Sequence, residues 1–446
     1  MKGIEKLEIE ATEIYGKLIR GDDIQLKKFM QKPSKQLKDM CCVIIGTGNT
    51  LIHEAIHKSK LQLLAFFLKN GADINTRNKE GLTPLHAALL YKNFRAAKFL
   101  IESGASVNEI VSQKTGQSLL HKMVWANRRQ AAKLLLEEGA VVSRKDKLGR
   151  TPLHFTAMRG NVYMIPMFLE KGGELNAMDN MNRTPLLLSL MYKNPDIAKI
   201  LLEEGADVTI KDKIGNSPLH IAVIEKYTEV AKLIVSRNAI NVNTKEKIMG
   251  RTPLHLACEK NYQKLVGLLL ENGADVNLTT TFRKSPLHLT VLNGATELVP
   301  QLLNRTRNVN MLSLGNKTAL HNAVEGGYYN IANLLIQAKA KTNVHDTHGL
   351  TPLHHVARLG YTDCANLLIK EGAQVNSSDS KQMTPLHHAA ETNQMDMVNT
   401  LLRSGGDLNL QDEDGKIPLD YDTNGELQAL LDRKSARRRR HAQIDR

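Results

Sequence analysis

Histidine is the residue type in this sequence with the widest chemical scope, because imidazole serves both as a metal ligand and as a general acid or base. Sixteen histidines are present. Ten of them close a four-residue word, Thr-Pro-Leu-His or a degenerate form of it, and these ten lie about 33 residues apart. Such spacing assigns each histidine to a separate structural unit. We therefore expect a ladder of structural histidines rather than a metal-binding or catalytic cluster.

Some histidines also lie close together in the sequence. The local pairs are His53/His57, His345/His348, His354/His355 and His387/His388. No cysteine stands at ligand spacing from any pair, and Asp346, between His345 and His348, is a carboxylate that could add a ligand. The dinucleotide-binding, Walker, GxSxG and HExxH motifs are absent from the sequence. We therefore expect a protein that is not an enzyme, without a catalytic residue, a cofactor or a bound metal.

The Thr-Pro-Leu-His word recurs along nearly the whole chain of 446 residues. Its fourth position falls at residues 53, 86, 121, 154, 187, 220, 255, 288, 321, 354, 387 and 420. Of the eleven intervals, nine are 33 residues and two are 35. Chance matches would give irregular gaps, so the pattern predicts about twelve tandem repeats over residues 48–432.

One full copy, residues 146–160, reads DKLGRTPLHFTAMRG, and residues 268–277, LLLENGADVN, show the second apolar segment of another copy. The period of 33 and the T-P-L-H-x-A signature resemble the ankyrin repeat. This resemblance implies an all-α fold: a solenoid of stacked helix-turn-helix units with hairpin-like loops, shaped as a curved rod. It also implies that the recurrent histidine is structural and bonds neighbouring backbone near the hairpin.

The residues of the repeat have physical roles that agree with this reading. Thr or Ser can cap the first helix, and Pro suits its first turn, where no N–H is needed. Leu and Ala four residues apart share one buried face. Glycines such as Gly160 end the first helix, and Gly71 and its equivalents end the second. Pro166 and Pro300 occupy one slot near the start of a second helix, which we expect them to bend or tighten.

The position of the repeats and the charge distribution divide the chain into three predicted segments. We expect capping helices in residues 1–47, the array in 48–432 and a disordered basic tail in 433–446. The net charge is +14, of which the tail supplies +6 from seven Lys/Arg and one Asp. The four cysteines show no paired spacing and are interpreted as buried hydrophobes in a reducing compartment. The absence of a signal peptide or an apolar run of membrane-spanning length favours the cytoplasm. We expect a monomer, because a capped solenoid has no obligatory partner surface.

Binding is expected on the concave face, where two positions near the end of each first helix should be exposed. In the second to sixth repeats these positions hold a stripe with Trp, Tyr and Met, which is typical of a protein-binding hot spot. The alternative is that these side chains are core between adjacent helices. The candidate partner-binding residues are Leu90, Tyr91, Trp125, Met158, Arg159, Met191, Tyr192 and Ile224.

Basic residues in the hairpin loops extend this hypothesis. They include Lys147, Arg150, Arg183 and Lys213. An apolar client segment flanked by acidic residues would suit such a surface, although the same residues could be a solvated basic edge. Nucleic acid is not an expected partner, because aromatic residues do not alternate with the basic ones and no nucleic-acid-binding motif is present.

The basic tail is a candidate nuclear localisation signal, with a solubilising tail as the alternative. The residues concerned are Arg433, Lys434, Arg437, Arg438, Arg439 and Arg440. The leading functional hypothesis is a scaffold or adaptor in the cytoplasm that binds a client protein. Regulatory capture of a nuclear factor, a latrotoxin-like effector and a substrate receptor for ubiquitin ligation are the alternatives. The short chain after the last repeat disfavours the ubiquitin-ligase reading, and no visible membrane-inserting region supports the effector.

Overall fold

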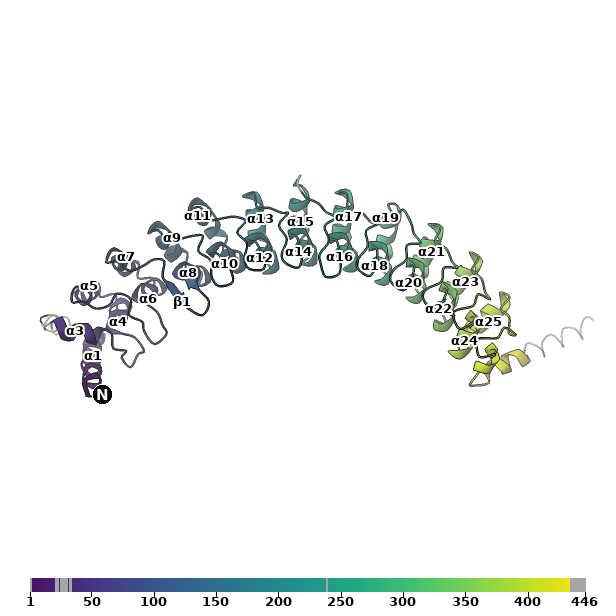
Figure 1. Ribbon diagram of the computed structural model, residues 1–446, viewed down its shortest axis with the longest axis horizontal. Helices are drawn as coiled ribbons and strands as arrows, with labels where there is room; N and C mark the ends of the chain where they lie inside the picture. Colours follow the sequence, from purple (N-terminus) through teal and green to yellow (C-terminus); the bar gives the residue numbers. More distant parts are fainter. Residues whose placement is uncertain (1, 21–23, 25–30, 32–33, 238–239, 434–446) are drawn as a thin grey trace, which may run out of the picture. The chain divides into compact units, whose positions relative to one another are not determined.

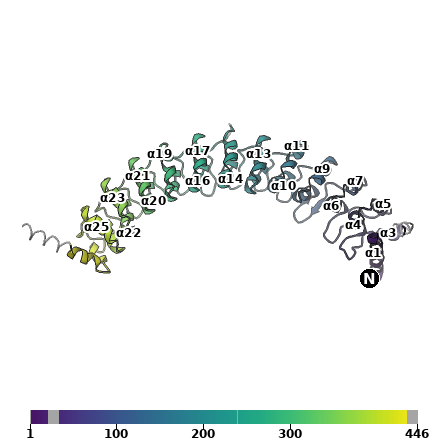
Figure 2. The same ribbon diagram turned by 180° about the vertical axis from the view of Figure 1, so that it is seen from behind.

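The computed structural model describes residues 2–20, 24, 31, 34–237 and 240–433, and the chain divides into two compact units, Met1–Lys213 and Ile214–Arg446. Both units consist of helix pairs, so the predicted all-α solenoid of helix-turn-helix units is confirmed. Within each unit the first helices form one row and the second helices another (Figure 1, and Figure 2 from behind).

The first unit contains five helix pairs among its described residues. Its first-helix row is α4 (Leu51–His57), α6 (Pro84–Leu90), α8 (Leu119–Trp125), α10 (Pro152–Arg159) and α12 (Pro185–Met191). Its second-helix row is α5 (Leu61–Lys69), α7 (Phe94–Glu102), α9 (Arg129–Glu137), α11 (Ile165–Glu170) and α13 (Pro195–Glu203). Two further helices, α1 (Lys2–Arg20) and α3 (Ser34–Cys41), pack against α4, while their role as a cap stays a prediction.

The second unit repeats the arrangement. Its first-helix row is α14 (Pro218–Ile224), α16 (Pro253–Glu259), α18 (Pro286–Leu292), α20 (Ala319–Glu325), α22 (Pro352–Leu359) and α24 (Pro385–Glu391). Its second-helix row is α15 (Thr228–Val235), α17 (Gln263–Glu271), α19 (Val299–Leu303), α21 (Tyr329–Gln337), α23 (Thr362–Lys370) and α25 (Met395–Arg403). A 3₁₀ turn, η3 (Pro418–Tyr421), replaces the first helix after α25, and residues 426–433 are helical.

The core of each unit is the space between its rows. The first helices are almost wholly buried, as in α10, because they pack against neighbours on both sides and against their own second helix. The second helices bury one face only: α13 buries Ile197, Ala198, Leu201 and Leu202, which share one stripe of the helix. This division leaves the ends of the first helices, the outer faces of the second helices and the hairpin loops in contact with solvent.

The recurrent histidine is structural, as the resemblance implied. In α10 the Thr151 N–H donates to Nδ1 of His154 over 3.0 Å, so the neutral ring carries its proton on Nε2, which donates to the Arg183 carbonyl over 3.0 Å. Burial lowers the pKa of His154 to about 4. The same reach to the next hairpin recurs for His53, His121, His220, His255, His288, His321, His354 and His387. Each ring therefore links one helix pair to the hairpin that precedes the next helix pair.

Several of the hairpins are closed by a buried acid. The Asp146 carboxylate accepts hydrogen bonds from the backbone N–H groups of Leu148 and Arg150, both over 2.9 Å. Consecutive tips are joined through the backbone, as where the Asn180 N–H donates to the Leu148 carbonyl over 2.9 Å. The tips of a unit are thus held in a fixed row.

The interior prolines, one longer hairpin and the cysteines are the local departures from the regular repeat. A 3₁₀ turn starts the second helix before each interior proline: η1 (Val162–Met164) precedes α11, and η2 (Thr296–Leu298) precedes α19, so the predicted tightening is confirmed. The longer spacing before α8 is a longer hairpin containing the antiparallel strands β1 (Ile110–Ser112) and β2 (Gln117–Ser118). The prediction of four buried cysteines was wrong for Cys42, which is exposed because it follows the last residue of α3.

Candidate protein-binding site

Four of the large exposed apolar side chains of the first unit lie at the C-terminal ends of its first helices. Tyr91, Trp125, Met191 and Tyr192 are between 37% and 47% exposed, and Arg159 is exposed beside them. We call these five residues the helix-end surface. They come from α6, α8, α10 and α12, which follow one another in the row (Figure 1).

Local backbone geometry explains why these positions face solvent. After α6, Tyr91 is the C-cap and Lys92 adopts a φ of 59°, and after α12, Tyr192 and Lys193 (φ 61°) do the same. The left-handed residue ends the helix and redirects the chain to the second row. The last side chains of the first helix therefore extend beyond the packed part of the unit.

Trp125 is exposed but held in place by two neighbours from α10. Its ring lies edge-on to Phe155 at a centroid distance of 5.9 Å, and the Arg159 guanidinium lies 4.9 Å from the centre of the indole. The Arg150 guanidinium in turn stacks on Phe155 at 4.7 Å. A large ring held in one orientation loses little entropy on binding, which is the property of a hot-spot residue.

The sequence prediction missed Phe155 and was wrong about Met158. Phe155 directly follows the structural histidine of its unit, where an aromatic ring was the available signal for a support beneath Trp125. Met158 is buried, although it occupies the slot equivalent to Trp125 and Met191, and its helix α10 packs between α8 and α12. Leu90 is half-buried and contributes little surface. Ile224 is also half-buried and belongs to the second unit, so it is not part of the helix-end surface.

The predicted basic hairpin residues fall into two kinds. Lys147 and Lys213 are exposed, and no described carboxylate forms an ion pair with either. Arg150 and Arg183 are instead paired at 2.7 Å with Asp146 and Asp179, the buried acids that close their own hairpins. Describing these two arginines as part of a free basic edge was therefore wrong, because each neutralises a carboxylate four residues earlier.

Burial opposes ionisation of Asp179, but hydrogen bonds from the Arg183 side chain and from backbone N–H groups outweigh it, so the pKa of Asp179 is lowered. Arg183 is thus held as part of the hairpin. Arg159, which lies against Trp125, supplies positive charge to the helix-end surface, and Lys147 supplies it at a hairpin tip.

Of the candidate nuclear localisation residues, Arg433 is exposed, and Lys434 and Arg437 to Arg440 lie outside the described residues. Within the described ranges, every helix is too short or too polar to cross a lipid bilayer. Across the same ranges, His, Cys, Asp and Glu side chains nowhere gather in groups of three that could hold a metal ion.

The local histidine pairs serve hairpin closure in the second unit. His355 is buried, with Nε2 at 3.0 Å from Asp346 and Nδ1 at 2.8 Å from Glu325. Lys317 lies 2.5 Å from the same Glu325 carboxylate. One ring therefore links the end of α20, the following hairpin and α22, while His388 contacts Asp379 one unit later.

This network predicts an acid-sensitive contribution from Glu325. Burial disfavours its charge, but hydrogen bonds from His355 and Lys317 dominate and lower its pKa to about 2. A depressed carboxyl pKa stabilises the fold above the unfolded pKa of about 4.5, and that stabilisation is lost as the pH falls towards 2. We expect Glu325→Gln to cost about 1–2 kcal/mol at pH 7 after allowance for solvent screening, and less at pH 3, in urea unfolding.

The matched control is Glu391→Gln. Glu391 ends α24 as Glu325 ends α20, but it lies 3.7 Å from His388 and its side chain is half exposed. We expect little change from this variant at either pH. If Glu325→Gln lowers the free energy of unfolding equally at pH 7 and pH 3, the ionised Glu325 carboxylate is not the stabilising group.

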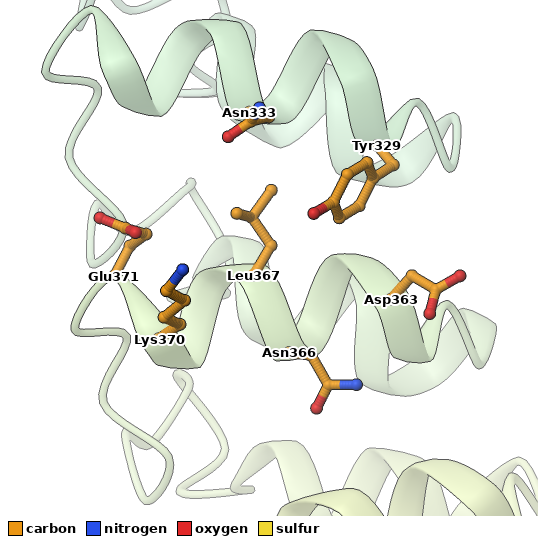
Figure 3. A pocket seen from close by; sticks show the side chains of 7 residues that line it. All are labelled: Tyr329, Asn333, Asp363, Asn366, Leu367, Lys370 and Glu371. Carbon is orange, nitrogen blue, oxygen red and sulfur yellow. The ribbon is translucent and has the colours of Figure 1, made fainter.

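A recess lies on the second-helix row of the second unit, between α21 and α23 (Figure 3). It has a volume of about 520 Å³ and is lined by Tyr329, Asn333, Asp363, Asn366, Leu367, Lys370 and Glu371. Charges of both signs border an open groove, and most of the lining side chains are exposed. This chemistry indicates no ligand class, so the helix-end surface is the stronger site.

Comparison with known families identifies the repeat. A family model described as "Ankyrin repeats (3 copies)" matches residues 120–212, 211–280, 272–346 and 338–412. The chain belongs to the ankyrin-repeat family. A second model, "Ankyrin repeats (many copies)", matches residues 52–101. Ankyrin repeats are generally non-catalytic and mediate contacts between proteins, while the count of twelve repeats stays a prediction.

Several ankyrin-repeat relatives are similar over short stretches. An ankyrin repeat protein of Fowlpox virus (strain NVSL) is 30% identical over 110 residues, which are 24% of this chain and 18% of that protein. The nuclear factor NF-kappa-B p105 subunit of Mus musculus is 30% identical over 118 residues, 26% of this chain and 12% of its own length. Protein phosphatase 1 regulatory subunit 27 of Homo sapiens is 35% identical over 86 residues, 19% of this chain and 53% of its own length. The chain therefore spans only part of each of these relatives.

Proposed function

We propose that this ankyrin-repeat chain is a non-enzymatic adaptor, acting in the cytoplasm, that binds a client protein through the helix-end surface of its first unit. The observation that supports this function best is Trp125, a large ring that is half exposed yet fixed between Phe155 and Arg159. A large, fixed aromatic ring beside further exposed apolar residues and an arginine is typical of a protein-binding surface. The client segment should present an apolar side chain to Trp125 and Tyr192, with a carboxylate near Arg159 or Lys147.

The test is capture of partners from cell lysate by the intact protein and by the double variant Trp125→Ala/Tyr192→Ala. We expect a client that the intact protein retains to be lost by the double variant, because truncating two hot-spot residues typically weakens binding by more than about 2 kcal/mol. Both side chains are half exposed, so the variant should keep the thermal unfolding temperature of the wild type.

The matched control is Tyr163→Ala. Tyr163 is an exposed aromatic residue of the second-helix row, and the Arg129 guanidinium lies 5.1 Å from the centre of its ring. Retention of the same partners by the helix-end variant, with an unchanged unfolding temperature, would remove the helix-end surface as the binding site.

Regulatory capture of a nuclear factor is the second candidate. The similarity to a protein named as an NF-kappa-B subunit and the basic run at residues 433–440 favour it. This candidate predicts that the captured client is a nuclear protein and that removal of residues 433–446 keeps the chain out of the nucleus. The first candidate predicts a client of the cytoplasm and no effect of the tail on localisation.

A further inference from the structure

The hairpin tips of the second unit carry large apolar side chains that their fold does not require. Ile248, Phe282 and Leu314 stand at three consecutive tips and are between 46% and 68% exposed. The next three tips of the same unit carry polar residues instead, namely His348, Lys381 and Asp414 in the slot of Phe282, and Thr347, Ser380 and Glu413 in the slot of Leu314, one position earlier. Because both kinds of tip close through a buried side chain and backbone hydrogen bonds, the apolar residues are not needed to form the turn.

A row of backbone hydrogen bonds holds these tips in line. The Thr281 N–H donates to the Met249 carbonyl over 2.9 Å, and the Leu314 N–H donates to the Phe282 carbonyl over 2.9 Å. At the start of the row, the Lys247 N–H donates to the Ile214 carbonyl over 2.8 Å. Ile214 is a further exposed apolar residue. The tips that carry these apolar side chains are therefore held side by side in a fixed row.

The charge along this row is positive. Lys247 and Arg283 are exposed and Lys284 is partly exposed, and no described carboxylate forms an ion pair with any of them. The acid of the first tip, Glu246, is buried and accepts hydrogen bonds from the backbone N–H groups of Ile248, Met249 and Arg251. Its charge is thus used inside the hairpin, which leaves the outer surface of the tips basic.

We propose that these tips, the tip ridge of Ile248, Phe282, Leu314, Lys247 and Arg283, bind an extended acidic peptide segment of a protein partner. Neighbouring helix pairs of the stack are spaced by about 8–10 Å. Three residues of an extended polyproline II segment make one turn, so residues i and i+3 lie on the same side and about 9 Å apart. The segment therefore carries an apolar residue at every third position, with Asp or Glu between. This surface lies in the second unit and is separate from the helix-end surface of the proposed function.

A peptide fits the ridge better than the other anionic partners do. A lipid bilayer has no repeat that would match one apolar side chain per tip. A nucleic acid would need several stacking rings, and Phe282 is the only aromatic residue among these three tips. The acidic extended segment matches the apolar spacing and the charge together.

The test uses a fluorescein-labelled peptide of four Leu-Asp-Glu triplets and the full chain, with fluorescence anisotropy as the readout. The comparison peptide has the same composition but groups its leucines at one end. We expect saturable binding of the periodic peptide, and binding weaker by about tenfold or more for the grouped peptide and for the variant Ile248→Ser/Phe282→Ser. Lys247→Glu/Arg283→Glu should weaken binding further.

Two controls make the result specific. His348→Ser/Lys381→Ser changes the polar tips of the same unit and should leave peptide affinity unchanged. Trp125→Ala/Tyr192→Ala removes the helix-end surface and should also leave it unchanged, which separates this proposal from the proposed function. Equal binding of both peptides, equal loss in either control, or binding of phosphatidylserine vesicles that depends on Ile248 and Phe282 in place of the peptide would overturn the proposal.

Discussion

Replacing Gly349 by alanine should destabilise the second unit by about 2–4 kcal/mol. Gly349 lies at a hairpin tip with a φ of +74°, a conformation that is strained for any L side chain. A Cβ placed there would lie 2.6 Å from the Ser380 nitrogen, whose N–H donates to the His348 carbonyl. The neighbouring tip would have to move away, and the hydrogen bond between the two tips would be lost.

Gly415→Ala is the matched control for this substitution. Gly415 occupies the same position of the last hairpin with a φ of +76°, and a Cβ there would meet no atom within 4 Å. We expect only the conformational cost, about 1 kcal/mol. Urea unfolding followed by circular dichroism measures both variants. Equal losses would mean that contact between tips contributes nothing to stability.

The parts of the fold that depend on local chemistry were predictable from the sequence. Caps, prolines and glycines act within a few residues of where they stand, so the start of α10 after Thr151 and its end at Gly160 could be predicted. The 33-residue period then extended one unit to the whole array. The structural role of the histidine also followed, although only through the resemblance, since its acceptor lies 29 residues further along the chain.

The exposure of individual site residues could not be predicted in the same way. Trp125, Met158 and Met191 share one slot of the repeat, yet Met158 alone is buried. Exposure depends on the size and direction of the side chains on both neighbouring helices, which a single repeat does not encode. The ion pair between Arg183 and Asp179 could have been predicted from the sequence, because two residues four positions apart across a hairpin can form one.

The apolar tips show a different limit. A repeat consensus draws attention to positions that stay the same, whereas Ile248, Phe282 and Leu314 differ in type, and Ile248 falls in a longer interval. Glu246 closes a loop that is one residue longer than usual: its N–H donates to the Arg251 carbonyl, five residues on, whereas Asp146 bonds Arg150, four residues on. Only the structure brings these three side chains onto one row.

Replacing His154 by alanine should destabilise the first unit by about 3–4 kcal/mol. The ring accepts from Thr151 and donates to the Arg183 carbonyl, so its loss leaves a buried N–H and a carbonyl unpaired, together with a cavity. His86→Ala is the control, because His86 is also buried but its Nδ1 has no partner among the described residues. We expect His86→Ala to cost less by about 1–2 kcal/mol.

The pH dependence gives this prediction a second readout. Burial lowers the pKa of both His154 and His86 to about 4, below the ordinary value of 6.5. The unfolded chain therefore binds protons more readily than the folded one, and the stability of the wild type falls as the pH drops from 6.5 to 4. Each alanine variant lacks one such group, so its loss in the free energy of unfolding relative to the wild type should shrink by a similar amount between pH 6.5 and 4.

Unfolding at pH 7 and pH 5 tests this prediction. A loss for His154→Ala that exceeds the loss for His86→Ala at both pH values supports the hydrogen-bonded link. Equal deficits would show that the ring stabilises the stack by packing alone.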